Sequence, residues 1–222
     1  MIKETVMVVG AHPDDETFGC GGTLALNNQM GNQVYVLCLS CNPENRRKEL
    51  LEAAKELGIN EPKIFDAKEV SLTQESVRQV SDQIVNVKPT IMITHLPFDY
   101  HREHKVTHDI VKEAIEWAGH TTTYNDPWVV KRLLLMEVNT LIPQPHVNVN
   151  VSKVYNMKRE AIKRFKTQLE KFPSGYYEKF NHAKALLRGV QGGCEFAESY
   201  LEEAIASHSP FFREKTANKL FS

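Results

Sequence analysis

Two short segments of the sequence concentrate the residue types that bind metal ions and transfer protons. Residues 10–16 read Gly-Ala-His-Pro-Asp-Asp-Glu, and residues 95–104 contain three histidines, an aspartate and a glutamate. Zinc favours imidazole and carboxylate ligands, and a catalytic zinc keeps three protein ligands and a water. The first segment can supply His12 and Asp15, and the second can supply a further histidine. Asp14 would then stay off the metal and take a proton from its water, whose pKa zinc lowers to about 7.

Each of these segments directly follows an apolar run that is typical of a strand buried on both faces. Residues 5–9 precede the first segment, and residues 90–94 precede the second. Such runs indicate a parallel sheet covered by helices. Ligands of open parallel sheets bind beyond the carboxyl ends of the strands, so we expect the two segments to meet at one edge of a sheet.

Strand and helix patterns alternate along the chain, which predicts a parallel sheet with right-handed crossovers. We expect further strands at residues 33–39, 63–65, 130–138 and 147–151, and helices at residues 21–26, 46–57, 75–87, 105–118, 152–172, from residue 181, and at 198–207. The pattern predicts an α/β fold of three layers. It is Rossmann-like, with a mostly parallel sheet, helices on both faces and a C-terminal helical extension. We expect residues 1–222 to form one domain.

Composition and cysteine usage narrow the classes of function. The net charge of −1 gives no reason to expect nucleic acid or an anionic membrane as partner. We see no leader pattern and no apolar run near the ~18 residues of a membrane span, and we expect a cytoplasmic protein. Cys38 and Cys41 form a Cys-x-x-Cys pair. This pair could serve a redox or metal-relay function, or its cysteines could simply be two small residues that pack at the end of a strand. We favour the structural role.

The sequence Ala11-His12-Pro13-Asp14-Asp15-Glu16, followed by residues 21–25, resembles the opening motif of the LmbE-like, or PIG-L, family of zinc-dependent N-deacetylases. The resemblance implies that His12 and Asp15 bind zinc and that Asp14 is the general base. Other divalent transition metals would suit the same ligands.

The second segment, His101-Arg102-Glu103-His104, is similar to the family's His-Pro-Asp-His motif. The resemblance implies that His104 is the third metal ligand. It also implies that His101 stabilises the oxyanion or protonates the leaving amine. Glu103 stands where the family has an aspartate that holds this histidine, so its contact must reach one methylene further or be redirected. Asp99 either supports the site from behind or only begins a turn.

The resemblance extends over most of the chain. Arg46-Arg47-Lys48-Glu49 is similar to a family helix start, which implies that Arg46 faces the site and binds substrate hydroxyls. A solvated basic helix start is the alternative. Residues 192–200 resemble a late family segment that ends in Ala-Glu. His108 follows His104 by four residues, and we favour a packing or surface role over a second metal site.

These observations predict a zinc-dependent hydrolase that removes the N-acetyl group from an N-acetylated amino sugar or its conjugate. Its partner would be that small molecule, and a homo-oligomer is compatible with the sequence. Two alternatives remain open. One is an amidase that acts on a thiol-sugar conjugate, and the other is a metal-binding relative without activity.

Overall fold

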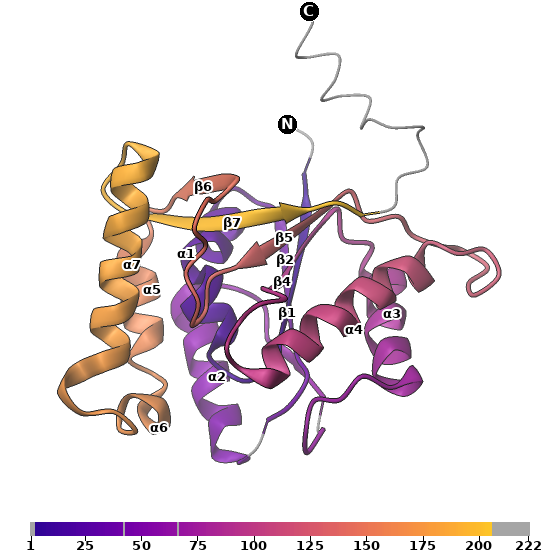
Figure 1. Ribbon diagram of the computed structural model, residues 1–222, viewed down its shortest axis with the longest axis horizontal. Helices are drawn as coiled ribbons and strands as arrows, with labels where there is room; N and C mark the ends of the chain where they lie inside the picture. The colour runs from indigo at the N-terminus through magenta and orange to yellow at the C-terminus, as the bar shows by residue number, and fades with distance from the viewer. Residues whose placement is uncertain (1–2, 42, 66, 206–222) are drawn as a thin grey trace, which may run out of the picture.

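A seven-stranded sheet forms the centre of the protein, in a computed structural model that describes residues 3–41, 43–65 and 67–205. The strand order is β3-β2-β1-β4-β5-β7-β6 (Figure 1). The strands are β1 (Thr5–Gly10), β2 (Gln33–Cys38), β3 (Lys63–Ile64), β4 (Ile91–His95), β5 (Arg132–Met136), β6 (Val147–Asn150) and β7 (Ala197–Glu203). Neighbours from β3 to β5 pair in parallel, whereas β7 pairs antiparallel with both β5 and β6.

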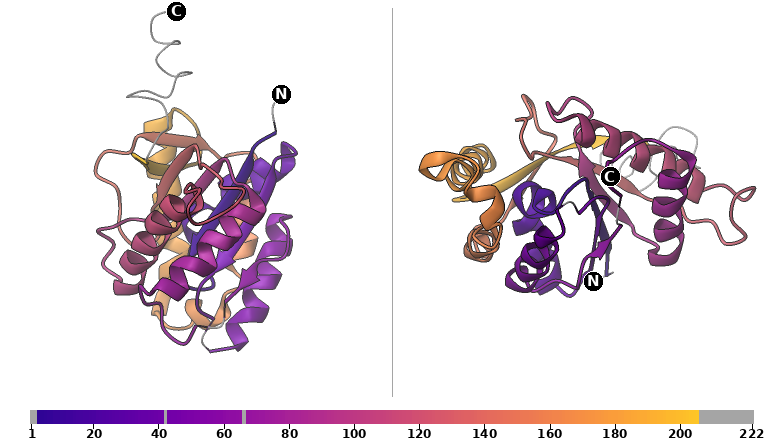
Figure 2. Two further views of the ribbon diagram at one scale, coloured as in Figure 1. Left: turned by 90° about the vertical axis from the view of Figure 1, so that its right-hand side faces the viewer. Right: turned by 90° about the horizontal axis from the view of Figure 1, so that it is seen from below.

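Helices cover both faces of this sheet. They are α1 (Asp15–Gln29), α2 (Asn45–Leu57), α3 (Gln74–Val87), α4 (Arg102–Ala118), α5 (Tyr155–Ile162), α6 (Lys166–Leu169), the 3₁₀ turn η1 (Pro173–Gly175) and α7 (Tyr176–Gly192). Figures 1 and 2 show α3 and α4 on one face, and α1, α2, α5 and α7 on the other. The predicted three-layer α/β fold with a mostly parallel sheet and a C-terminal helical part is therefore confirmed.

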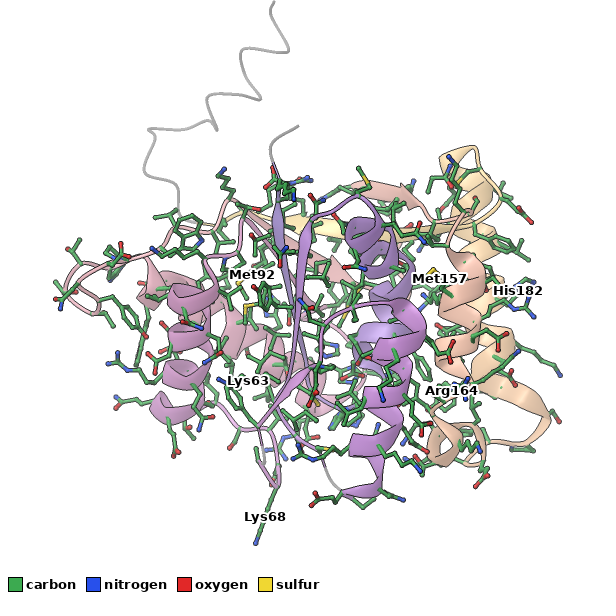
Figure 3. All side chains as sticks on the ribbon, turned by 180° about the vertical axis from the view of Figure 1, so that it is seen from behind. Lys63, Lys68, Met92, Met157, Arg164 and His182 are labelled. Atoms are coloured by element: carbon green, nitrogen blue, oxygen red, sulfur yellow. The ribbon has the colours of Figure 1, made fainter. Side chains whose placement is uncertain are left out.

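The alternation of side chains along the strands builds a core on each side of the sheet. Val6 and Val8 pack with the α1, α2 and α5 layer, while Met7 and Val9 pack with the α3 and α4 layer. Met92 of β4 lies in this second core (Figure 3). Successive residues of a strand point to opposite faces, so a strand buried on both sides reads as a continuous apolar run.

The last predicted helix is wrong. Residues 197–203 form β7, and of the expected range 198–207 the last two residues lie outside the described part of the chain. Glu, Ala and Leu favour a helix in isolation, but pairing along β5 and β6 overrides that preference. Arg132 of β5 donates two hydrogen bonds of 2.9 Å to the carboxylate of Glu202, which helps to set the register between β5 and β7.

The helix predicted at residues 152–172 is interrupted. It is present as the short helices α5 and α6, and between them Phe165 has a non-helical ψ of 59°. The ring of Phe165 is buried against Phe18 of α1, at 5.8 Å between centroids. Packing of this ring accounts for the break. Every helix in the described part of the chain is too short or too polar to cross a membrane.

Candidate metal and catalytic site

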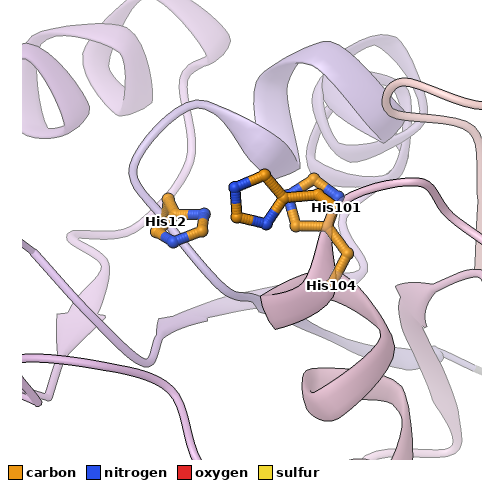
Figure 4. Close-up of side chains that lie close together, drawn as sticks. All are labelled: His12, His101 and His104. Atoms are coloured by element: carbon orange, nitrogen blue, oxygen red, sulfur yellow. The ribbon is translucent and has the colours of Figure 1, made fainter.

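The two polar segments meet at the carboxyl edge of the sheet, as the sequence predicted. β1 and β4 are parallel neighbours with Val8 opposite Ile93, so the chain leaves both strands on the same side. His12 lies in the turn between β1 and α1, whereas His101 and His104 lie at the start of α4. Figure 4 shows the three imidazole rings gathered where these segments meet.

Asp15 connects the other two predicted ligands, His12 and His104. Its Oδ1 lies 3.2 Å from His104 Nε2, and its Oδ2 lies 3.7 Å from His12 Nδ1. Burial alone would raise the pKa of Asp15, but His104 and His95 beside it lower that pKa well below its ordinary value. The carboxylate is therefore ionised, as a metal ligand must be.

Two overlapping groups of side chains bring possible ligand atoms within 4.8 Å of one another: His12 with His101 and His104, and Asp15 with His95 and His104. The predicted set of His12, Asp15 and His104 draws on both groups. His104 belongs to each of them, so the structure places it at the centre of any metal site here. The polar contacts of the remaining nitrogens distinguish ligands from supporting residues.

The outer nitrogens of His12 and His104 are each held by a carboxylate. Nε2 of His12 contacts Glu103, and Nδ1 of His104 lies 3.3 Å from Asp99 Oδ1. Histidines that bind a metal through one nitrogen commonly donate the other N–H to a carboxylate, which fixes ring and tautomer. Nδ1 of His12 and Nε2 of His104 both face Asp15. The donor set therefore fits a divalent transition metal.

Glu103 is redirected, compared with the family role of the aspartate at its position. Its Oε2 contacts His12, and its Oε1 accepts the backbone N–H of Val70 at 3.0 Å. Nδ1 of His101 instead accepts a hydrogen bond from the backbone N–H of Glu103, at 3.3 Å. The backbone of α4, and not the Glu103 carboxylate, orients the ring of His101.

His95 is a residue of this site that sequence reasoning left unassigned. Its Nε2 accepts the backbone N–H of Ala11 at 3.0 Å, and its ring stacks on His104 at 3.9 Å between centroids. Burial lowers the pKa of His95 to about 4, so the ring is neutral. Because the lone pair of Nε2 is already used, His95 supports the ligands rather than joining them. Its position at the end of a buried strand was the available signal.

Asp14 occupies a strained position beside the ligands. Its φ is 118° and its ψ is −30°, and strain of this kind gathers at active sites. Arg46 Nη2 lies 3.0 Å from Asp14 Oδ2 and also donates to the carbonyl of Pro13. Burial raises the pKa of Asp14, although the Arg46 charge opposes this effect. Arg46 is buried and faces the site, so the solvated helix start is excluded.

A cavity of about 160 Å³ opens over these residues. Its walls come from the start of α1 and α4, from β5–β6, and from the region of α6 and α7. The lining residues are His12, Asp14, Asp15, Phe18, Arg46, Tyr100, His101, His104, Val138, Asn139, Gln168, Lys171 and Tyr177. Asp14 and His101, the two predicted catalytic residues, therefore border the same space as the candidate metal ligands.

Helix α1, which begins at Asp15, is broken next to the cavity. Cys20 has a non-helical φ of −145°, which frees the backbone carbonyl of Phe18. Two buried lysines donate to that carbonyl: Lys158 at 3.1 Å and Lys184 at 3.2 Å. The break is thus satisfied by side chains from α5 and α7.

The other side of the break is held by Glu198 of β7. Its carboxylate accepts the backbone N–H groups of Gly22 and Thr23, at 2.9 and 2.7 Å. It also pairs with Lys158 Nζ at 2.6 Å in the interior. Burial alone would raise the pKa of Glu198, but Lys158 and Thr23 lower it below its ordinary value. The late Ala-Glu segment, whose match to the family was weak alone, therefore completes the N-terminal helix.

Two secondary predictions concern side chains outside the cavity. The buried thiol of Cys38 donates to the carbonyl of Ser40, and burial raises the pKa of this thiol well above its ordinary value. A protonated, buried thiol is a poor nucleophile, which favours a structural role for this residue over a redox role. His108 bridges Asp109 and Glu203 at 3.0 and 2.6 Å. It joins α4 to β7, as expected of a packing histidine.

Similar folds occur in proteins of different activity. The structure matches the N,N'-diacetylchitobiose deacetylase from Pyrococcus horikoshii with a TM-score of 0.77 at 21% identity, over 90% of this chain and 84% of that one. It also matches GalB, the 4-carboxy-2-hydroxymuconate hydratase from Pseudomonas putida, with a TM-score of 0.80 at 20% identity, over 94% and 100% of the two chains. At these identities the likeness shows the fold alone.

Sequence similarity is more specific. The chain is 26% identical over 191 residues to the probable N-acetyl-alpha-D-glucosaminyl L-malate deacetylase 2 of Bacillus subtilis, over 76% of this chain and 85% of that protein. Residues 7–115, which carry both polar segments, match the family described as PIG-L: GlcNAc-PI de-N-acetylase. The part of the chain that holds the candidate site therefore resembles the PIG-L family.

Proposed function

We propose that this protein is a metal-dependent hydrolase that removes the N-acetyl group from an N-acetylated amino sugar or a conjugate of one. One observation carries the proposal: two histidines flank Asp15, and each is held from behind by its own carboxylate. That arrangement leaves one nitrogen of each ring free toward a common carboxylate, as a catalytic metal centre requires. The fold is shared with a hydratase, so the residues of the site, and not the fold, distinguish this activity.

His12, Asp15 and His104 would hold the metal, and zinc is the ion that this donor set favours. When bound, the ion supplies a Lewis acid for the acyl carbonyl and lowers the pKa of a water. The N-acetylglucosaminyl and diacetylchitobiose deacetylases among the relatives support an amino sugar as substrate. Arg46 pairs with Asp14 and lines the cavity, where its guanidinium group can bind sugar hydroxyls.

Asp14 acts as the general base in this proposal. Its carboxylate borders the cavity, and its Oδ2 pairs with Arg46 at 3.0 Å, so we assign Oδ1 to the attacking water. A raised pKa suits a carboxylate that takes a proton from water and then returns it to the leaving amine.

His101 stabilises the negative charge that develops on the acyl oxygen. Because its Nδ1 accepts the Glu103 backbone N–H, the ring proton of neutral His101 is on Nε2. Burial lowers the pKa of His101, which favours this neutral form. We therefore assign the neutral N–H donor of His101 to the oxyanion.

The test is acetate release from a panel of N-acetylated amino sugars, with protein whose metal content has been measured. Asp14→Asn should keep the metal and lower kcat by about 10² to 10⁴, the usual contribution of a general base. Asp126→Asn, a surface aspartate paired with Lys88, is the matched control and should behave as wild type.

Full turnover in metal-loaded Asp14→Asn would remove Asp14 from the mechanism. No acetate from any sugar, with metal bound, would favour a relative without activity. Release of an amine but no acetate from a thiol-sugar conjugate would favour the amidase alternative.

A further inference from the structure

The cavity is small for a substrate site. Its volume of about 160 Å³ is below the 300–1,000 Å³ that is typical of small-molecule pockets, and it is open at one side. One acetamido sugar would occupy this volume together with its acyl group. Anything attached to that sugar must then lie outside, against the surface around the mouth.

Aromatic side chains crowd that surface. Tyr100, from the segment between β4 and α4, lines the mouth and is 70% exposed. Phe172 and Tyr176, on either side of η1, are 45% and 51% exposed. Both pack on Tyr177, at 5.4 and 5.3 Å between centroids, and Tyr177 lines the cavity. We name Tyr100, Phe172, Tyr176 and Tyr177 the aromatic rim.

The rim is continuous with the inside of the cavity and is held in place. Tyr177 packs on Phe18 of α1 at 5.3 Å between centroids, so the aromatic surface runs from the cavity wall outward. The turn before Tyr176 uses positive φ at Ser174 (64°) and Gly175 (67°). Ser174 adopts this conformation without being glycine, which indicates that the surrounding packing determines the turn.

We propose that the aromatic rim binds a second sugar ring, attached to the N-acetylated sugar inside the cavity. This inference rests on the proposed function. An aromatic face is negative and attracts the polarised C–H groups of a pyranose. Exposing several large rings to water is unfavourable unless they serve recognition.

The chemistry of the surroundings favours a sugar over a lipid chain. Among the described residues that line the cavity, Val138 is the one aliphatic side chain, and it is buried. Lys171, Asn139 and the hydroxyl of Tyr177 offer hydrogen bonds at the same wall. Burial first, and the charge of Asp14 second, raise the pKa of Tyr177 to about 12, so its hydroxyl remains a donor. A polyhydroxylated ring matches aromatic faces flanked by polar groups, whereas an acyl chain would leave those polar groups unpaired.

The experiment compares N-acetylglucosamine with N,N'-diacetylchitobiose, by acetate release and by calorimetric binding to metal-loaded Asp14→Asn. Wild-type kcat/KM and affinity should favour the disaccharide by about tenfold. In Tyr100→Ala and Tyr176→Ala this preference should fall to about threefold or less. Leu187→Ala is the control: Leu187 is an exposed residue of α7 that does not line the cavity, and the variant should keep the full preference.

Equal kcat/KM for the two sugars, or a rim variant that keeps the tenfold preference, would overturn the inference while acetate release upheld the proposed function. Tighter disaccharide binding without any acetate release would support the rim and refute the proposed function. If octyl N-acetylglucosaminide bound more tightly than the disaccharide, the rim would be a lipid site and the inference would fail. Absence of both binding and release would refute both.

Discussion

The backbone strain at Asp14 leads to a test that separates conformation from charge. With φ at 118°, any residue that has a β-carbon is strained here, at a cost of about 1–3 kcal/mol. Asp14→Ala and Asp14→Gly both remove the carboxylate and its pair with Arg46, so that loss cancels between them. Glycine relieves the strain but loses about 0.5–1 kcal/mol through the entropy of the unfolded chain. We expect Asp14→Gly to be more stable than Asp14→Ala by about 1 kcal/mol.

Urea unfolding of the metal-free variants, followed by circular dichroism, measures this difference. Lys48 provides the control, because it is exposed within α2 and has no positive φ. There the order should reverse, with Lys48→Ala more stable than Lys48→Gly by about 1 kcal/mol. If alanine were also the more stable residue at position 14, the strain would not exist and the reasoning would be refuted. Both Asp14 variants should release acetate more slowly than wild type by about 10² to 10⁴.

Three further predictions concern the supports of the site. Glu103→Gln should weaken metal affinity by about tenfold or more in a competition titration, because it removes the charge behind a ligand histidine; unchanged affinity would contradict that role. Glu198→Gln should lower the free energy of unfolding by about 3 kcal/mol at neutral pH, since Lys158 is left buried and unpaired. The folded pKa of Glu198 is depressed below 4.5, so this contribution is present above that pH and lost as pH falls through the folded value. The difference from wild type should therefore shrink in acid, and a constant difference would count against the pair. Gly22→Ala should unfold at lower urea, because the new β-carbon would lie 2.9 Å from Val151.

The central strands and helices were predictable because their signals are local. Residues 6–9 and 91–93 are apolar throughout, which is typical of a strand covered on both faces. Glu75 to Val87 carries its buried residues at helical spacing, and Thr73 adds a capping box before them. The late chain gave weaker signals, because β7 is defined by its partners. Its residues have no strong common preference for a strand, and antiparallel pairing with β5 and β6 makes it one.

The candidate site, like the fold, was predictable where the signal is local and not where it depends on distant partners. Strand ends placed His12, Asp15 and His104 together, since parallel neighbours share an edge. The partner of Glu103 was not predictable, because an extra methylene changes which side chain a carboxylate reaches. The carboxylate of Glu103 contacts the ring of His12 and the backbone N–H of Val70, and both residues come from other parts of the chain. The ring of His101 is oriented by a backbone N–H, which no side-chain pattern reveals.

Because helix α1 is broken, its folding depends on residues of α5, α7 and β7, which are synthesised much later than α1 itself. During synthesis the metal-binding turn leaves the ribosome early, whereas Glu198 lies 176 residues beyond Gly22. Until Lys158, Lys184 and Glu198 have been synthesised, the backbone polar groups at the break near Cys20 lack the partners that they have in the buried interior of the folded protein. The nascent chain must therefore hold its site half-formed, open to chaperones and proteases, and the last strand acts as the step that closes it.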